Sequence, residues 1–189
     1  LGISRVKVEL DDLALRYLEP KAYHEIEEKI EEMSQSKERV IESLVEKVQH
    51  LMNSERIPSS VIGRRKHIFS IYKKMVSQNK SFDEIYDIFA VRVLVQDLKD
   101  CYAALGALHV NFTPLSERFK DYIARPKPNR YQSLHTTLID RGGTLFEVQI
   151  RTYEMDKVAE YGIAAHWKYK EKAKGENPTV TGGEAEKMR

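Results

Sequence analysis

A short segment, residues 118–130, concentrates positive charge in a way that suits the binding of a polyphosphate. Its thirteen residues include five cations: Arg118, Lys120, Arg125, Lys127 and Arg130. Tyr131 follows directly, and a carboxylate, Glu147, lies in a strand-like run further along the chain. Cationic side chains neutralise phosphate charge, and an aromatic ring can stack on a base. The segment therefore predicts a site for a nucleotide that carries several phosphates.

A second basic segment, residues 64–74, predicts a helix with a phosphate-binding side. Apolar residues recur at helical spacing, at Ile68, Ile71, Tyr72 and Met75. This spacing predicts a helix from about Lys66 to Gln78 with one buried face. Lys66, Ser70 and Lys74 are four residues apart and form a stripe roughly opposite that face. Arg64 and Arg65 are expected at the amino end, where free N–H groups and the helix dipole favour an anion. The alternative is a solvated basic face; a P-loop is excluded because GxxxxGK[ST] is absent.

Two carboxylates could complete such a site by holding a metal ion. Asp87 precedes a buried strand, and Glu147 lies in the later strand. One or two carboxylates with water and substrate phosphates suit Mg²⁺, and Mn²⁺ could take its place. The alternative for Asp87 is a cap on a helix or turn. Zinc is not expected, because His135, His166 and Cys101 lack the spacing of zinc ligands.

The strands expected to position these groups form a hairpin. Residues 131–140 and 144–152 predict antiparallel strands joined at Arg141-Gly142-Gly143. Alternation places polar residues on one face of each strand, Leu145 excepted: Tyr131, Ser133, His135 and Thr137 in the first, Leu145, Glu147, Gln149 and Arg151 in the second. A rigid hairpin would bring these polar faces together as a site. A merely solvated sheet face is the alternative.

The remaining pattern predicts an α+β fold. Residues 9–53 have helical periodicity that Pro20 interrupts. The apolar side of these helices would either pack within this protein or form a contact surface for another domain. Strands are predicted at 59–62 and 88–95, and helices at 98–111 and 153–172. We expect a helical lead-in over 1–54, one domain over 55–172, and a tail without regular structure over 173–189. A mixed or antiparallel sheet flanked by helices fits this order.

Composition narrows the function classes. A net charge of +2 over 189 residues is too small to indicate general nucleic-acid binding. No apolar run approaches the roughly 20 residues that cross a bilayer, so no membrane contact is expected. A single cysteine, Cys101, excludes an internal disulfide and favours a reducing, cytoplasmic location. Because residue 1 is Leu, we expect a part of a longer protein.

Several ordered motifs resemble one family. GRRKHIFSIYKKM, YDIFAVRVLV, RFKDYIARPKPNRYQSLHTT, EVQIRT and AEYGIAAHW are together similar to the synthetase domain of the RelA/SpoT homologues, over about residues 55–170. These are the alarmone synthetases of the bacterial stringent response. The resemblance implies a nucleotidyltransferase-like (polymerase-β-like) fold. It also implies a GTP pyrophosphokinase, which transfers the β,γ-pyrophosphoryl group of ATP to the 3′-hydroxyl of GDP or GTP and leaves AMP and (p)ppGpp.

The resemblance also implies a role for each matching residue. Asp87 and Glu147 would bind Mg²⁺, and Glu147 would also act as the base. Four residues would hold the ATP phosphates: Arg64, Lys66, Ser70 and Lys74. Tyr131 would stack on guanine. The acceptor site would include Arg118, Lys120, Lys127, Asn129, His135 and Gln149. The RFKD run containing Arg118 and Lys120 is similar to the form found in bifunctional members.

Three positions depart from the family pattern, and other domains are implied. Arg65 stands where proline is usual, Arg130 where glycine is usual, and Asp156 where histidine is common. Long members carry hydrolase and C-terminal regulatory domains, and the latter would account for any contact with ribosomes or RNA. No hydrolase HD motif is present in this sequence, so we expect no degradation of the product by this chain.

Two other functions stay open at this point. Basic clusters with Tyr122 and Tyr131 could form a non-catalytic RNA-binding module. That module leaves Asp87 and Glu147 unexplained, since carboxylates repel a polyanion unless a metal lies between them. A different nucleotidyltransferase on the same fold, acting on an RNA end or a small molecule, is the other possibility.

Overall fold

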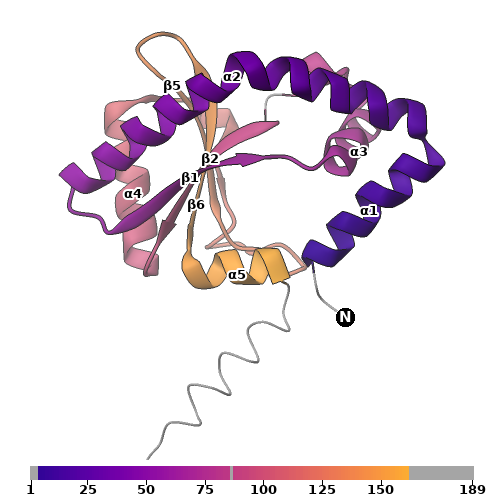
Figure 1. Ribbon diagram of the computed structural model, residues 1–189. Coiled ribbons are helices and arrows are strands. Elements are labelled where there is room, and N and C mark those ends of the chain that lie inside the picture. The colour runs from indigo at the N-terminus through magenta and orange to yellow at the C-terminus, as the bar shows by residue number, and fades with distance from the viewer. Residues whose placement is uncertain (1–3, 86, 162–189) are drawn as a thin grey trace, which may run out of the picture.

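The computed structural model describes residues 4–85 and 87–161. The first half contains α1 (Ser4–Leu18), α2 (Pro20–Ser54), β1 (Ser59–Arg65), α3 (Ile68–Gln78), η1 (Phe82–Glu84) and β2 (Phe89–Val95). The second half contains α4 (Leu98–Asn111), β3 (Thr113–Pro114), η2 (Ser116–Arg118), β4 (Lys120–Asp121), β5 (Leu134–Ile139), β6 (Leu145–Thr152) and α5 (Tyr153–Tyr161). Figure 1 shows these elements as a twisted sheet surrounded by helices.

The strands form one mixed sheet, as the sequence predicted. Their order is β1-β2-β6-β5-β3, and β4 also pairs with β5. Only β2 and β6 run parallel among the described strands, and the other pairs are antiparallel. Residues 89–95 of β2 are buried apart from Phe89, which suits a strand enclosed on both faces. The α+β prediction with a mixed sheet is confirmed.

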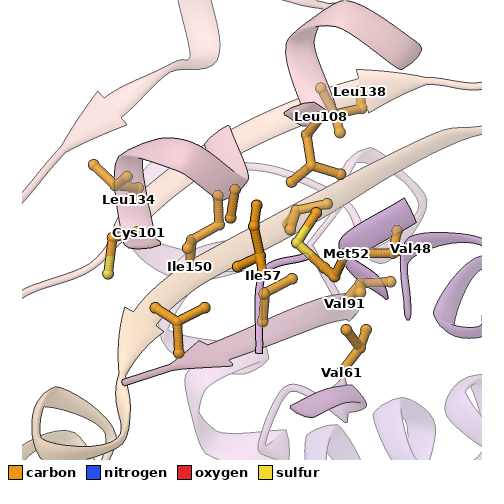
Figure 2. Packing of buried hydrophobic residues seen from close by; sticks show 14 of the residues in the cluster. Val48, Met52, Ile57, Val61, Val91, Cys101, Leu108, Leu134, Leu138 and Ile150 are labelled. Carbon is orange, nitrogen blue, oxygen red and sulfur yellow. The ribbon is translucent and has the colours of Figure 1, made fainter. Parts of the chain in front are cut away.

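The main core lies between one face of the sheet and two helices. The carboxyl half of α2 contributes Leu44, Val48 and Met52, and α4 contributes Cys101, Ala104 and Leu108. The sheet contributes its alternate apolar residues, several of which are labelled in Figure 2: Val61, Val91, Val93, Leu134, Leu138, Val148 and Ile150. Because side chains alternate along a strand, this arrangement directs the polar residues of β2 and β6 to the opposite face.

A second apolar cluster attaches the amino-terminal helices. Ile26 and Ile30 of α2 pack in one cluster with Leu15 of α1 and Ile71 of α3. Phe82, Ile85 and Ile88 belong to the same cluster. Pro20 begins α2, where its missing N–H is tolerated, and the chain bends there between α1 and α2 (Figure 1). The lead-in helices therefore belong to the same packed body, while the domain division proposed at residue 54 stays a prediction.

Several element boundaries differ from the sequence-based predictions. Strand β1 continues to Arg65, because Arg64 and Arg65 pair with Ala90 and Phe89 of β2. Strand β5 begins only at Leu134. The short strands β3 and β4 were not predicted, since two residues show no periodicity. The part of the last predicted helix after Tyr161 and the predicted tail lie outside the described residues.

The hairpin turn was placed correctly. Gly143 has a positive φ of 80°, a conformation that glycine adopts without strain, and its N–H donates to the Asp140 carbonyl. The Asp140 carboxylate accepts from the Thr144 N–H.

None of the helices in the described ranges combines the length and apolar character needed to cross a bilayer.

Gly63 allows β1 to approach α2 closely, and this predicts a size limit at that position. A Cβ atom at Gly63 would lie 3.0 Å from Ile41 Cγ2. We expect Gly63→Val to lower the free energy of unfolding by about 1–3 kcal/mol, because overpacking forces the helix and strand apart. Thermal denaturation measures this as a fall in Tm of roughly 2–4 °C per kcal/mol.

The matched control for Gly63→Val is Gly106→Ala. Gly106 lies within α4, where nothing is within 4 Å of an added Cβ. Alanine should raise stability there by about 0.5–1 kcal/mol, since it is the better helix former. Equal Tm values for wild type and Gly63→Val would contradict the proposed contact.

Candidate active site

The face of the sheet opposite the main core carries the polar residues predicted for the site. Glu147 of β6 lies beside Ala90 of β2 and Thr137 of β5. Gln149 lies between Arg92 of β2 and His135 of β5. Residues directly opposite each other in a sheet point to the same face. The predicted hairpin thus joins its polar faces, and β2 adds an arginine to them.

A cavity of about 450 Å³, which we call the acidic hollow, gathers six of the predicted residues. The two carboxylates, Asp87 and Glu147, lie on it together although they are far apart in sequence. Its predicted cationic and polar lining consists of Lys74, Arg118, Lys120 and His135. The geometry therefore meets the main requirement of the sequence-based hypothesis, which is the convergence of the two acids beside cations.

Both oxygens of Asp87 accept from lysines. Lys66 Nζ donates to Oδ2 at 2.6 Å, and Lys74 Nζ donates to Oδ1 at 2.8 Å. Burial by itself would raise the pKa of Asp87, but these two charged hydrogen bonds outweigh it and hold the pKa at about 2. Asp87 is thus ionised at neutral pH, and it is not the cap of a helix or turn.

Glu147 has a contrasting electrostatic environment. Burial raises its pKa, and the nearby negative charge of Asp87 raises it further. His135 Nδ1 lies 3.7 Å from Glu147 Oε1, and His135 Nε2 shares a hydrogen bond of 2.8 Å with the Tyr131 hydroxyl. Burial and then Arg151 lower the pKa of His135 to about 3, so the imidazole is neutral and forms no ion pair with Glu147. A buried carboxylate with a raised pKa is suited to accept a proton.

A second cavity of about 580 Å³, which we call the arginine hollow, shares this face of the sheet. Arg64 and Ser70, two of the residues predicted for ATP, line it together with Tyr131. Arg65, Arg92, Gln149 and Arg151 also line it. Three of the four residues predicted for the ATP phosphates line the hollows, with Lys74 in the acidic hollow and Arg64 and Ser70 in the arginine hollow. The fourth, Lys66, lines neither hollow and contacts Asp87.

Two buried guanidinium groups form the base of the arginine hollow. Gln149 Oε1 accepts from Arg92 and from Arg151 at 3.0–3.3 Å. Asp156 Oδ1 lies 3.1 Å from Arg92 Nη1 and 3.4 Å from Arg151 Nε, and Glu160 lies 3.3 Å from Arg92 Nη1. The Arg151 guanidinium lies 5.5 Å from the ring centroid of Tyr131. Helix α5 therefore supplies the negative charge that balances these cations.

Several predicted residues lie elsewhere than expected. Arg64 and Arg65 belong to β1 rather than to a helix start, because their backbone groups pair with β2. The helix begins at Ile68, so Lys66 precedes it and reaches Asp87 from the connection. Gln149 faces the two arginines rather than only an acceptor site. Asn129 accepts from the Tyr131 N–H, which shapes the loop.

The loop before β5 holds Tyr131 in a cluster of rings and cations. Lys127 Nζ lies 4.5 Å from the ring centroid of Tyr122 and 5.3 Å from that of Tyr131. Arg130 has a φ of 61°, a backbone conformation that glycine adopts more readily than arginine. Tyr131 is only partly exposed, so it presents a limited surface for stacking.

Arg92, Arg151 and Asp156 were not assigned to the site from the sequence. Arg92 is a single charge within the apolar run IFAVRVLV, and a charge in a buried strand is itself a signal of a polar partner. Arg151 lies on the predicted polar face of EVQIRT, two residues from Gln149. Only the fold reveals that Asp156 contacts both arginines.

Comparison with known proteins identifies the family. Residues 63–174, more than half of the chain, match the family described as "Region found in RelA / SpoT proteins". The chain belongs to the RelA/SpoT family. It is 49% identical over 173 residues to a GTP pyrophosphokinase of Streptomyces coelicolor, and 47% identical over 173 residues to one of Escherichia coli K12. It is 50% identical over 182 residues to a probable guanosine-3′,5′-bis(diphosphate) 3′-pyrophosphohydrolase of Synechocystis.

The match to these RelA/SpoT relatives covers only part of each. It includes 92%, 92% and 96% of this chain but 20%, 23% and 24% of the three relatives, respectively. Among solved structures, the small alarmone synthetase 1 of Bacillus subtilis is similar, with a TM-score of 0.58 and 25% identity over 79% of this chain and 83% of that one. A GTP pyrophosphokinase family protein of Streptococcus pneumoniae has a TM-score of 0.57 and 25% identity, covering 79% and 80%. This RelA/SpoT domain shares the fold of alarmone synthetases.

The contacts of Asp156 predict its effect on stability. In Asp156→Asn, the buried cations Arg92 and Arg151 lose the charge of a shared partner. We expect the free energy of unfolding to fall by about 1–3 kcal/mol, as for other hydrogen bonds to charged groups. Urea denaturation measures the change, with Glu42→Gln on the exposed side of α2 as control. A midpoint equal to that of the control would show that Asp156 does not stabilise the arginine pair.

Proposed function

We propose that this domain is a GTP pyrophosphokinase. It transfers the β,γ-pyrophosphoryl group of ATP to the 3′-hydroxyl of GDP or GTP and forms AMP and (p)ppGpp. The observation that carries the proposal is the convergence of Asp87, Glu147 and Lys74 at one hollow, with Lys66 hydrogen-bonded to Asp87 and a second hollow lined by arginines beside it. The names of the similar relatives support the same reaction.

The donor nucleotide is assigned to the arginine hollow and to its border with the acidic hollow. Arg64 and Ser70 would contact ATP in the arginine hollow, and Lys66 and Lys74 would hold the phosphates nearer to Asp87. Cationic side chains fixed by a sheet and a helix align the phosphates, and alignment with charge stabilisation is most of what phosphoryl-type transfer requires.

The acceptor nucleotide is assigned to the side of the acidic hollow formed by β4, β5 and the preceding loop. Arg118 and Lys120 line the hollow and would bind the acceptor phosphates, together with Lys127. Tyr131 lines the arginine hollow and shares a hydrogen bond with His135 of the acidic hollow, so it would stack on guanine where the two hollows meet. Asn129 would shape the loop, and Gln149 would act at the border between the two nucleotides.

The donor atoms at the acidic hollow fit a divalent cation. Mg²⁺ prefers oxygen ligands and keeps waters and phosphate oxygens, so two carboxylates are sufficient protein ligands. Asp87 and Glu147 supply them, whereas the described residues contain no group of three or more His, Cys, Asp or Glu side chains arranged for a metal. Mg²⁺, or Mn²⁺ in its place, would stabilise the negative charge that develops on the transferred phosphates.

Glu147 is assigned as the general base. Its raised pKa and its position opposite the cations suit removal of the proton from the 3′-hydroxyl, which then attacks the β-phosphorus of ATP. AMP leaves as the bond between the α- and β-phosphates breaks. His135 contributes a neutral contact at 3.7 Å and does not compete for the proton at neutral pH.

Other parts of the family's activity stay predictions. One similar relative is named as a hydrolase, but this chain spans only 24% of it, so hydrolysis is not assigned here. The hydrolase and C-terminal regulatory domains, and ribosome contact through them, rest on the family resemblance alone. An RNA-binding module is less well supported, because the carboxylates of Asp87 and Glu147 at the acidic hollow would repel an RNA backbone.

Incubation of the protein with ATP, Mg²⁺ and GDP tests the proposed function. We expect AMP and a guanosine nucleotide with two additional phosphates in equal amounts, resolved by anion-exchange chromatography. Glu147→Gln should lower kcat by about 10²–10⁴, the usual contribution of a general base. Glu42→Gln, an exposed change on α2, is the control. Pyrophosphate release with a lengthened product, or a normal rate in Glu147→Gln, would contradict the assignment.

The raised pKa of Glu147 predicts a pH dependence. A base acts only when ionised, so kcat/KM should fall as the pH decreases through the pKa of Glu147. Because burial and Asp87 raise that pKa, the decline should begin at a higher pH than for an ordinary glutamate. The pH–rate profile measures it. The residual activity of Glu147→Gln should lack this decline, and an identical decline in that variant would assign it to another group.

A further inference from the structure

Asp87, one of the two carboxylates assigned to the metal, is already engaged by two cations. Lys66 Nζ lies 2.6 Å from Oδ2, and Lys74 Nζ lies 2.8 Å from Oδ1, so each carboxylate oxygen has its own ammonium partner. The side chains of Asp87 and Lys66 are 15% and 16% exposed, and that of Lys74 is 28% exposed. Ion pairs that are this well covered are screened much less than those on a surface.

The backbone holds the three residues together from three separate segments. Lys66 lies in the connection between β1 and α3, and its N–H donates to the Ile88 carbonyl at 2.7 Å, next to Asp87. Lys74 lies on α3 and Asp87 lies just before β2. Because α3 holds Lys74 and a backbone hydrogen bond to Ile88 holds Lys66 next to Asp87, the fold itself brings both lysines to this carboxylate.

Glu147 differs from Asp87 in this respect. It lies on the same hollow, where Lys66 and Lys74 affect it only through their charge, and His135 Nδ1 lies 3.7 Å from its Oε1. Among the described residues, lysines therefore donate hydrogen bonds to Asp87 and not to Glu147. A metal ion that binds between them must approach the ammonium groups on Asp87.

Electrostatics makes that approach unfavourable as long as the lysines remain on Asp87. A divalent ion bound to a carboxylate oxygen at about 2.0–2.1 Å would lie close to both ammonium groups and be repelled by them. Phosphates offer the same lysines an alternative anionic partner of higher charge. If the lysines move to phosphates, the charge repulsion at Asp87 decreases and its oxygens become available.

We propose that Lys66 and Lys74 form a clamp on Asp87 that ATP opens, so that the cation binds to Asp87 only as the phosphates take over the two lysines. This inference rests on the proposed function, since it takes ATP as the donor. It predicts that ATP and the divalent cation favour each other's binding, and that this coupling is reciprocal. Lys66 and Lys74 are then positioning residues for the metal as well as phosphate ligands.

Binding of Mn²⁺ alone, measured by electron paramagnetic resonance without nucleotide, tests the clamp. Lys74→Met should bind Mn²⁺ at least about tenfold more tightly than wild type, because one of the two repelling charges is gone. Lys73→Met is the matched control, since Lys73 is the exposed neighbour on α3. The double variant Lys74→Met/Asp87→Asn should lose the gain. Equal Mn²⁺ affinity in Lys74→Met and Lys73→Met would overturn the proposal.

ATP binding in the presence of EDTA tests the other half of the exchange. Isothermal titration should show weaker ATP binding to Lys74→Met than to Lys73→Met; unchanged binding would overturn the transfer of the lysine to phosphate. Lys66→Met serves as the second variant if Lys74→Met does not fold, as judged by circular dichroism.

The clamp and the proposed function can fail separately. A wild-type protein that binds ATP but forms no AMP refutes the proposed function. An active wild-type protein, with no gain in Mn²⁺ affinity in either lysine variant, refutes only the clamp.

Discussion

The parallel pairing of β2 with β6 forces several charged side chains into a small part of one sheet face. Arg92 lies beside Gln149, and Arg151 follows two residues later on the same face. Both guanidiniums are almost fully buried, and two like charges at close range would be strongly unfavourable without shared acceptors. Gln149 accepts hydrogen bonds from both arginines, and Asp156 accepts from Arg92 and lies 3.4 Å from Arg151 Nε, so the position of α5 depends on the charges of the sheet as well as on apolar packing.

The same face contains a second set of balanced charges around Asp87. Two lysines outnumber the one carboxylate they contact, and Glu147 lies on the same hollow with a raised pKa. At Asp87, two positively charged lysines contact one carboxylate, so positive charge exceeds negative charge there. The excess positive charge can attract phosphate. A rigid support for this excess charge is provided by the opposite face, where α2 and α4 pack on the sheet (Figures 1 and 2).

Much of the fold and part of the site could be predicted from the sequence. The periodicity of β2, β6 and α4 was clear enough to place them within a residue or so, and the alternation in EVQIRT placed Glu147 and Gln149 on the polar face. Contacts between distant residues could not be predicted in this way, because no local pattern links Asp156 to Arg92 or Lys66 to Asp87. Strand β1 was underestimated for a related reason: Arg64 and Arg65 look like loop residues until their pairing with β2 is known.

The amino end of α3 is partly occupied by a carboxylate of the protein itself, which bears on how a phosphate could bind there. The Phe69 N–H, one of the free donors expected there, donates to Asp12 Oδ1 at 2.8 Å, from a residue 57 positions away on α1. The His67 imidazole also lies 4.0 Å from this carboxylate. A carboxylate of the protein thus already occupies part of the position that an anion would take at a helix amino terminus. In the proposed function, phosphate binding would therefore rely on side chains of β1 and α3. The extension of β1 to Arg65 is compatible with that role, because it keeps Arg64 on the arginine hollow.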